Sequence, residues 1–174
     1  MQDRIDQQRL TADLLLPWAI TGMMLVTLAA TIIICHTLGK QVQQPLPEDQ
    51  RVLVRTVLYG VAIVTFPVAN LIRHIQLRLA QTMPVIRPAY DKAGMPEAIN
   101  NVLASAKSRY LTTILVSVSL IESVGIYGLV MFMLGDGFNT LYIFIGMSVL
   151  GLLLYRPKRD EYDGIVEALV RAER

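Results

Sequence analysis

The chain has 174 residues, of which 53% are hydrophobic and 17% are charged, and its mean hydropathy is +0.47. Soluble domains contain about 45–50% apolar and about 25% charged residues, so this composition excludes an ordinary soluble domain. The net charge of +2 is too small to indicate nucleic-acid binding. The single cysteine, Cys35, excludes a disulfide framework and a thiolate metal site.

Residues 14–38 form the first predicted membrane span. They contain no Asp, Glu, Lys or Arg, and a membrane helix needs about 20 mostly apolar residues. Pro17 and Trp18 stand near its start, where we expect the proline in the first helical turn and the indole at the membrane surface. Residues 39–50 contain two prolines and several polar side chains, so they form a connector outside the hydrocarbon.

The second predicted span covers residues 54–74. Its uncharged run of 17 residues, 56–72, lies between Arg55 and Arg73, and these long side chains can extend it by reaching the membrane surface. A cytoplasmic connector, 75–109, follows. Within it, apolar residues at helical spacing begin after Pro96, and this helix either continues into the third span or lies along the membrane surface.

The third and fourth predicted spans are residues 110–134 and 138–155. The glycine-rich stretch 135–137 between them predicts a tight turn, so we expect these spans to form an antiparallel hairpin, as the first two do. An amphipathic tail, 156–174, has five apolar residues on one helical face, which are Tyr162, Ile165, Val166, Leu169 and Val170. The predicted fold class is therefore an all-α integral membrane protein, with residues 1–174 forming a single membrane domain of four spans.

Basic residues predict the orientation of these spans. The two terminal segments and the connector between the second and third spans share one side and hold thirteen Lys and Arg residues. The other side holds three, which are Lys40, Arg51 and Arg55. Cytoplasmic loops of membrane proteins are enriched in Lys and Arg. We therefore expect both termini in the cytoplasm of a bacterial cell, with the chain in its inner membrane.

Glu122 is the only charged residue of the third span and lies near its middle. Placing an ionised acid there costs about 2.5–3.5 kcal/mol, so Glu122 should face a partner, a cavity or a neighbouring subunit. Either it binds H+ or Na+ and changes protonation, or it is a protonated acid that donates a hydrogen bond between helices. Other polar candidates at this site are Ser119, Ser123, Tyr127, Thr65 and Asn70.

Gly125 and Gly128 lie three residues apart, so they are near one face of the third helix. Small residues let membrane helices approach each other closely. We therefore expect these two glycines at a helix-packing contact.

The segment around these residues reads IESVGIYGLVMFML and covers about 14 of the 174 residues. It is similar to the carboxylate-bearing helix of the proteolipid c subunit of rotary ATP synthases. The resemblance implies that Glu122 corresponds to the ion-carrying acid of that family, with residues 126–130 as the run beyond it. The chain also resembles small uncharacterised bacterial four-span membrane proteins that share this segment and carry an Arg-Pro step after the last span, here Arg156-Pro157.

These features favour a non-enzymatic subunit or accessory protein of an inner-membrane assembly, with Glu122 at a helix interface. The alternative is a proton- or sodium-translocating proteolipid that uses Glu122. The sequence contains none of the nucleotide-binding, hydrolase or metal-ligand motifs. We therefore expect no cofactor, no metal and no nucleic-acid partner. Membrane lipids and either further copies of this chain or a larger membrane complex are the expected partners.

Overall fold

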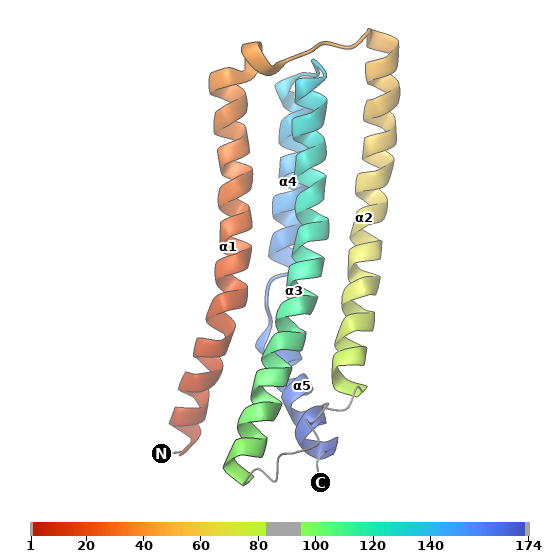
Figure 1. The fold of residues 1–174 in the computed structure, drawn as a ribbon. Helices are drawn as coiled ribbons and strands as arrows, with labels where there is room; N and C mark the ends of the chain where they lie inside the picture. The colour runs from red at the N-terminus through yellow and green to blue at the C-terminus, as the bar shows by residue number, and fades with distance from the viewer. Residues whose placement is uncertain (1, 83–94, 173–174) are drawn as a thin grey trace.

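The computed structural model describes residues 2–82 and 95–172, and their side chains over 14–39, 41, 43–82 and 103–171. This part of the chain is entirely helical, with no β-strand (Figure 1). The five helices are α1 (Gln2–Val42), α2 (Glu48–Thr82), α3 (Met95–Met133), α4 (Phe138–Leu154) and α5 (Arg159–Ala172).

Long apolar helices make the structure compatible with a multi-pass membrane protein. By length and composition, three of them are suited to crossing a membrane, within Leu14–Gly39, Glu48–Thr82 and Leu103–Met133. The 17 residues of α4 span about 26 Å at 1.5 Å per residue, less than a hydrocarbon core of about 30 Å. It qualifies as a fourth span only together with α5, from which it is bent by 46°.

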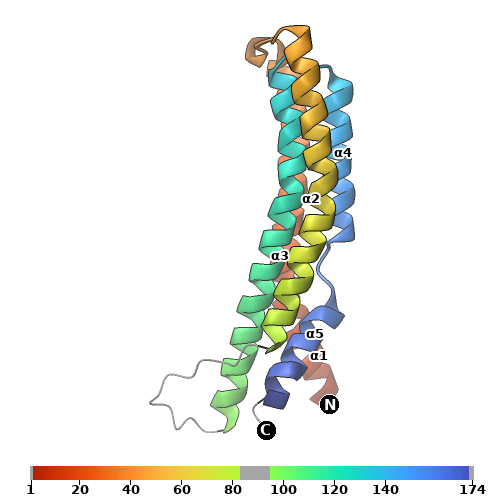
Figure 2. The same ribbon diagram turned by 90° about the vertical axis from the view of Figure 1, so that its right-hand side faces the viewer.

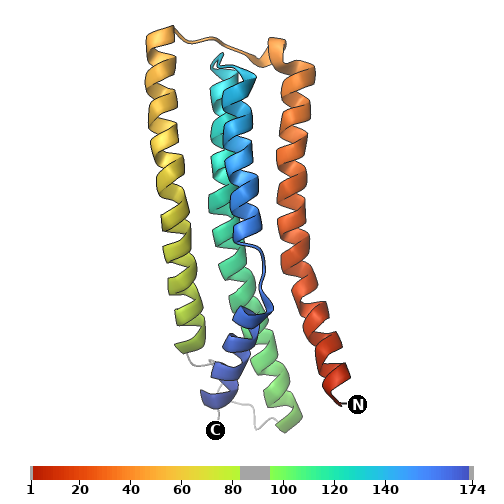
Figure 3. The same cartoon turned by 180° about the vertical axis from the view of Figure 1, so that it is seen from behind.

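The antiparallel pair α3–α4 forms the centre of the bundle, and α3 contacts all four other helices. The expected turn follows α3 directly, and α4 begins at Phe138. The first predicted hairpin differs from expectation. Although α1 and α2 run antiparallel, they lie on opposite sides of the α3–α4 pair and do not pack against each other (Figures 1 and 3).

Backbone hydrogen bonds of the connector explain why α1 and α2 are separated. The connector passes over the turn between α3 and α4, where the Gln44 N–H donates to the Met133 carbonyl at 2.7 Å. The Leu46 N–H donates in the same way to the Leu134 carbonyl at 3.1 Å. Between these bonds lies Pro45, directly over Gly135. The connector thus crosses the α3–α4 turn, where its polar backbone groups find hydrogen-bond partners. It does not form a tight turn that would bring α1 against α2.

The predicted position of Pro17 in a first helical turn is wrong, because α1 begins at Gln2 and places this proline inside the helix. An internal proline removes one helical hydrogen bond and crowds the preceding turn. One turn later, the Thr21 hydroxyl donates to the Pro17 carbonyl at 3.1 Å. In Figures 1 and 3 the N-terminal part of α1 diverges from the bundle axis.

Much of the predicted connector 75–109 is helical. The second helix continues to Thr82, and α3 begins at Met95 and runs without interruption into the apolar segment. Of the two arrangements considered for this segment, the structure therefore has the continuous helix. Residues 83–94 lie outside the described part of the chain.

The amphipathic tail forms α5, which packs against α2 and α3 (Figure 2). Tyr162, Ile165 and Leu169 are buried in this contact, while Val166 is half-buried and Val170 is exposed. The predicted apolar face is thus covered by the bundle at the end where α1 begins.

Candidate functional site

Glu122 lies on the outward face of α3. Exposed side chains follow this helix at intervals of three or four residues, and Glu122 falls between two of them, Ser119 and Ile126. Within residues 110–134, the other exposed members of this stripe are Thr112, Leu115, Val130 and Met133. Ile121, which precedes Glu122 in the sequence, is fully buried and faces α4. The helix therefore packs one apolar face into the bundle and leaves the acid on the opposite face, among exposed apolar side chains.

Glu122 is half-buried, and no hydrogen bond or ion pair joins its carboxyl group to another of the described residues. Neither of the two polar candidates on α2 contacts the Glu122 carboxyl through a hydrogen bond. Thr65 donates to the Val61 carbonyl of its own helix at 2.8 Å. Asn70 is exposed and has no hydrogen bond with Glu122. The structure thus does not join the α2 candidates to the acid.

The polar candidates on α3 form local hydrogen bonds. The Ser123 hydroxyl donates to the Leu120 carbonyl at 2.7 Å and lies 3.5 Å from the Tyr127 hydroxyl. Tyr127 packs edge-on against Phe144 of α4. Ser119 is exposed, one helical turn from Glu122. Of the candidate hydroxyl residues, Ser119 thus shares the outward stripe with the acid.

Both glycines lie where α3 meets its neighbours. A Cβ atom at Gly128 would be 2.8 Å from the Phe144 Cβ and 3.2 Å from the Leu141 carbonyl oxygen, both on α4. At Gly125 it would overlap the Leu28 side chain of α1. Because the Gly128 contacts involve backbone and Cβ atoms of α4, the absence of a side chain there is what allows α3 and α4 to approach so closely. The contact at Gly125 is with the end of a flexible side chain.

A lone carboxyl at this position has limited chemistry. A neutral carboxylic acid can donate one hydrogen bond and accept others, and an ionised one requires a cation or several donors. The described residues contain no group of three or more His, Cys, Asp or Glu side chains able to hold a metal ion. The arrangement suits hydrogen bonding to a group outside this chain, or reversible binding of a proton.

A second polar cluster, not anticipated from the sequence, joins α2, α3 and α5 to the chain at the end of α4. The buried guanidinium of Arg73 donates to the Tyr155 carbonyl at 2.5 Å and forms an ion pair with Glu161 at 2.6 Å. The Tyr110 hydroxyl donates to the Lys158 carbonyl and accepts from the Lys158 N–H. From the sequence, Arg73 is predicted only to bound the second span, and its position beside an apolar run is the one signal that points to it.

Comparison with known proteins found no family, no curated protein and no solved structure that matches this chain. The resemblance of the Glu122 segment to a proteolipid helix therefore stays a prediction.

Proposed function

We propose that this protein is a four-span, non-enzymatic subunit of an inner-membrane assembly, and that the outward stripe of α3 around Glu122 is where it contacts a neighbouring subunit. One observation carries the proposal. A half-buried carboxyl near the middle of a membrane-crossing helix lies on the surface of the bundle and has no bonding partner among the described residues. In hydrocarbon such a group is costly. A second subunit would provide it with a hydrogen-bond acceptor and remove it from lipid.

The shape of the bundle supports this proposal. The α1 and α2 helices lie on opposite sides of the α3–α4 pair (Figure 1). The side chains next to Glu122 on its stripe, Ser119 and Ile126, stay exposed. The stripe includes the small side chain of Ser119, which allows close approach of another helix. A neighbouring helix packed there would contact Ser119, Glu122 and Ile126 together, because they share one face.

The cytoplasmic location of both ends is part of the proposal and has its own test. Single cysteines at Gln50 and Glu167, both exposed, would be introduced into a Cys35→Ala background. A membrane-impermeant maleimide should label the Gln50→Cys protein in intact cells. The Glu167→Cys protein should react only after the membrane is opened. The reverse pattern would contradict the proposed orientation.

The assembly is tested through the mass of the protein purified in mild detergent. Glu122→Ala should weaken the complex, because it removes the carboxyl donor, and Glu122→Gln should retain it, because an amide still donates. Interhelical hydrogen bonds in membranes contribute about 0.6–2 kcal/mol each, so a partial loss of the complex is expected. A matched control is Met23→Ala, which shortens a side chain that is 73% exposed on α1. A wild-type protein that is monomeric by both native mass spectrometry and cross-linking in membranes would contradict the proposal.

The alternative function is translocation of H+ or Na+ by Glu122. The half-buried position of this acid at the bundle surface favours translocation, since an ion-carrying carboxyl must be reached from outside its own subunit. In this case Glu122→Gln should abolish pH-dependent ion flux into proteoliposomes while leaving the mass of the complex unchanged. A correctly assembled wild-type complex without flux would reject translocation and leave the subunit proposal intact.

A further inference from the structure

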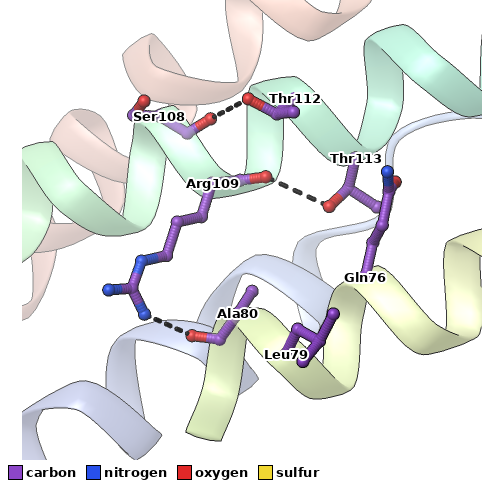
Figure 4. A pocket seen from close by; sticks show the side chains of 7 residues that line it. All are labelled: Gln76, Leu79, Ala80, Ser108, Arg109, Thr112 and Thr113. Carbon is purple, nitrogen blue, oxygen red and sulfur yellow. Dashed lines mark hydrogen bonds between the residues drawn. The ribbon is translucent and has the colours of Figure 1, made fainter. Parts of the chain in front are cut away.

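Most polar side chains in the apolar segment of α3 already have hydrogen-bond partners. Residues 110–134 contain eight side chains with an oxygen atom, and six of them form hydrogen bonds within the chain. The Thr112 and Thr113 hydroxyls, for example, donate to carbonyls one turn earlier at 3.0 and 3.1 Å (Figure 4). The other two side chains, Ser119 and Glu122, form no hydrogen bond with any described residue. Both are therefore available to a group outside this chain.

Ser119 and Glu122 lie side by side on the outward stripe of α3. Residues three apart are neighbours on a helix surface. Ser119 is exposed, and Glu122 is half-buried. Among the described residues that are not exposed, the one fully covered side-chain oxygen or nitrogen without a partner belongs to Gln76, so both carboxyl oxygens of Glu122 reach the surface. Since Leu115 and Ile126 on either side are 46% and 51% exposed, this hydroxyl and carboxyl form a small polar patch on an apolar surface.

The depth of this patch limits which partners it can have. Glu122 lies twelve residues from each end of the segment 110–134, or about 18 Å at 1.5 Å per residue. Its side chain is too short to reach the headgroups, and the hydrocarbon core has no water to bond it. None of the four apolar segments contains Lys or Arg. Another copy of this chain would therefore bring no cation to this depth, but it would bring a second Ser119 and a second Glu122.

Two copies of a membrane protein bring these residues together by symmetry. Copies in one membrane have the same orientation, so a two-fold axis between them runs along the membrane normal, and each interface residue meets its counterpart at equal depth. Leu115, Ser119, Glu122 and Ile126 are spaced by four, three and four residues, which is the pattern of two parallel helices that pack along one face. When the two stripes are in contact, each Glu122 therefore faces the Glu122 and Ser119 of the other copy.

The chemistry of this pair of residues is self-complementary. A neutral carboxylic acid has one O–H donor and an acceptor oxygen, and a hydroxyl has one donor and two acceptor positions. Each carboxyl can thus donate to the carboxyl or the hydroxyl of the second copy and accept from it in return. Two ionised carboxylates would repel each other, so at least one of the two acids holds a proton.

We propose that the subunit in contact with the Glu122 stripe is a second copy of this chain. The two copies form a parallel dimer in which the α3 helices pack along their stripes, and Ser119 and Glu122 of each copy bond those of the other in the hydrocarbon core. This inference rests on the proposed function, because it names the partner at the same surface. A stripe that packs against itself closes the contact at two copies.

The first test is the mass of the wild-type protein, purified in mild detergent and measured by native mass spectrometry. The dimer should have twice the 19.4 kDa mass of one chain and contain no other polypeptide. A complex of one copy with other polypeptides would overturn the homodimer and leave the proposed subunit contact intact. A monomer would overturn both.

Cross-linking in membranes locates the contact. Ser119→Cys and Ile126→Cys, each in a Cys35→Ala background, should form disulfide-linked dimers on oxidation, because a disulfide requires Cα atoms within about 7 Å. The control is Leu150→Cys, which is 58% exposed on α4. It lies near the depth of Glu122, since the Ser148 hydroxyl donates to the Ile121 carbonyl at 2.9 Å. Failure of both stripe cysteines to cross-link, or equal cross-linking of Leu150→Cys, would refute this interface.

Charge exchange tests whether the two acids meet. Glu122→Lys should not dimerise alone, because two ammonium groups repel, but it should form a mixed dimer with a differently tagged wild-type copy through an ion pair. Dimerisation of Glu122→Lys as strong as that of the wild type would refute the meeting of the two side chains, as would the absence of a mixed dimer from a folded variant.

A milder pair of variants decides the matter if the lysine prevents folding. In the Ile126→Cys, Cys35→Ala background, Glu122→Leu should weaken dimerisation about tenfold, or about 1.4 kcal/mol, because it keeps the bulk and removes the hydrogen bond. Glu122→Gln should retain the dimer, since its amide both donates and accepts. Equal cross-linking of the leucine and glutamine variants would refute the hydrogen bond between the copies.

Discussion

Arg73 of α2 and Glu161 of α5 form an ion pair of 2.6 Å across 88 positions of sequence. Their side chains are only 6% and 21% exposed. The same guanidinium donates to the Tyr155 carbonyl at the end of α4. The last carbonyls of a helix have no N–H partner within the helix. One side chain therefore connects α2, α4 and α5, and it fixes the bend at which α5 turns away from α4.

Replacing Arg73 should release α5 from the bundle. Removing one partner of a buried ion pair costs about 3–5 kcal/mol, because the other charge is left uncompensated. We expect Arg73→Leu to lower the melting temperature in detergent and to make α5 sensitive to limited proteolysis. Arg78→Leu, at an exposed position of the same helix, is the matched control. Equal proteolysis of the two variants would contradict this function of Arg73.

Gly128 and Gly146 should respond oppositely to alanine. At Gly128 an added Cβ would lie 2.8 Å from the Phe144 Cβ, whereas at Gly146 nothing lies within 4 Å. We expect Gly128→Ala to destabilise the protein by about 1–3 kcal/mol through overpacking. Gly146→Ala should stabilise α4 by about 0.5–1 kcal/mol, since alanine favours the helix. Thermal unfolding of both purified variants measures the difference, and similar shifts would show that α3 and α4 are not in this close contact.

The turn between α3 and α4 offers a second matched pair. Gly135 has a φ of +87° and lies against Pro45, while Gly137 has a φ of −76° and open space around it. A left-handed residue other than glycine costs about 1–2 kcal/mol, and Pro45 would add a steric clash. Gly135→Ala should therefore lower the melting temperature distinctly more than Gly137→Ala. Should Gly137→Ala be the more damaging change, the described turn is incorrect.

Docking of α5 should depend on pH through Asp163. Burial raises the pKa of this carboxyl, and the charges of Asp160 and Glu167 raise it further, while Arg159 lowers it. Because the folded-state pKa exceeds the unfolded value of about 3.9, the folded protein binds more protons between these two values. Stability should thus increase as pH falls through the raised pKa.

The check is the melting temperature as a function of pH. Asp163→Asn should stabilise the protein at neutral pH and flatten this part of the profile. Asp49→Asn, an exposed substitution in the first turn of α2, should leave the profile unchanged. A wild-type protein whose stability falls over this interval would contradict the assigned cause.

The sequence by itself determined the helical class and the approximate position of every helix, because hydrocarbon tolerates only long apolar segments with internally satisfied backbones. It also singled out Glu122, and it placed an amphipathic helix in the tail. The turn at Gly135 was predictable for the same local reason, since a short glycine-rich break between two apolar runs permits little else.

Only the tertiary structure decided which helices meet. In a helix that is apolar all round, periodicity shows which residues share a face but not which face meets a neighbour. The outward position of Glu122, the separation of α1 from α2, and the burial of Arg73 therefore depended on contacts between distant segments. A charge beside an apolar run has the same sequence pattern whether it reaches solvent, as expected for Arg73, or bonds a carbonyl of another helix, as it does here.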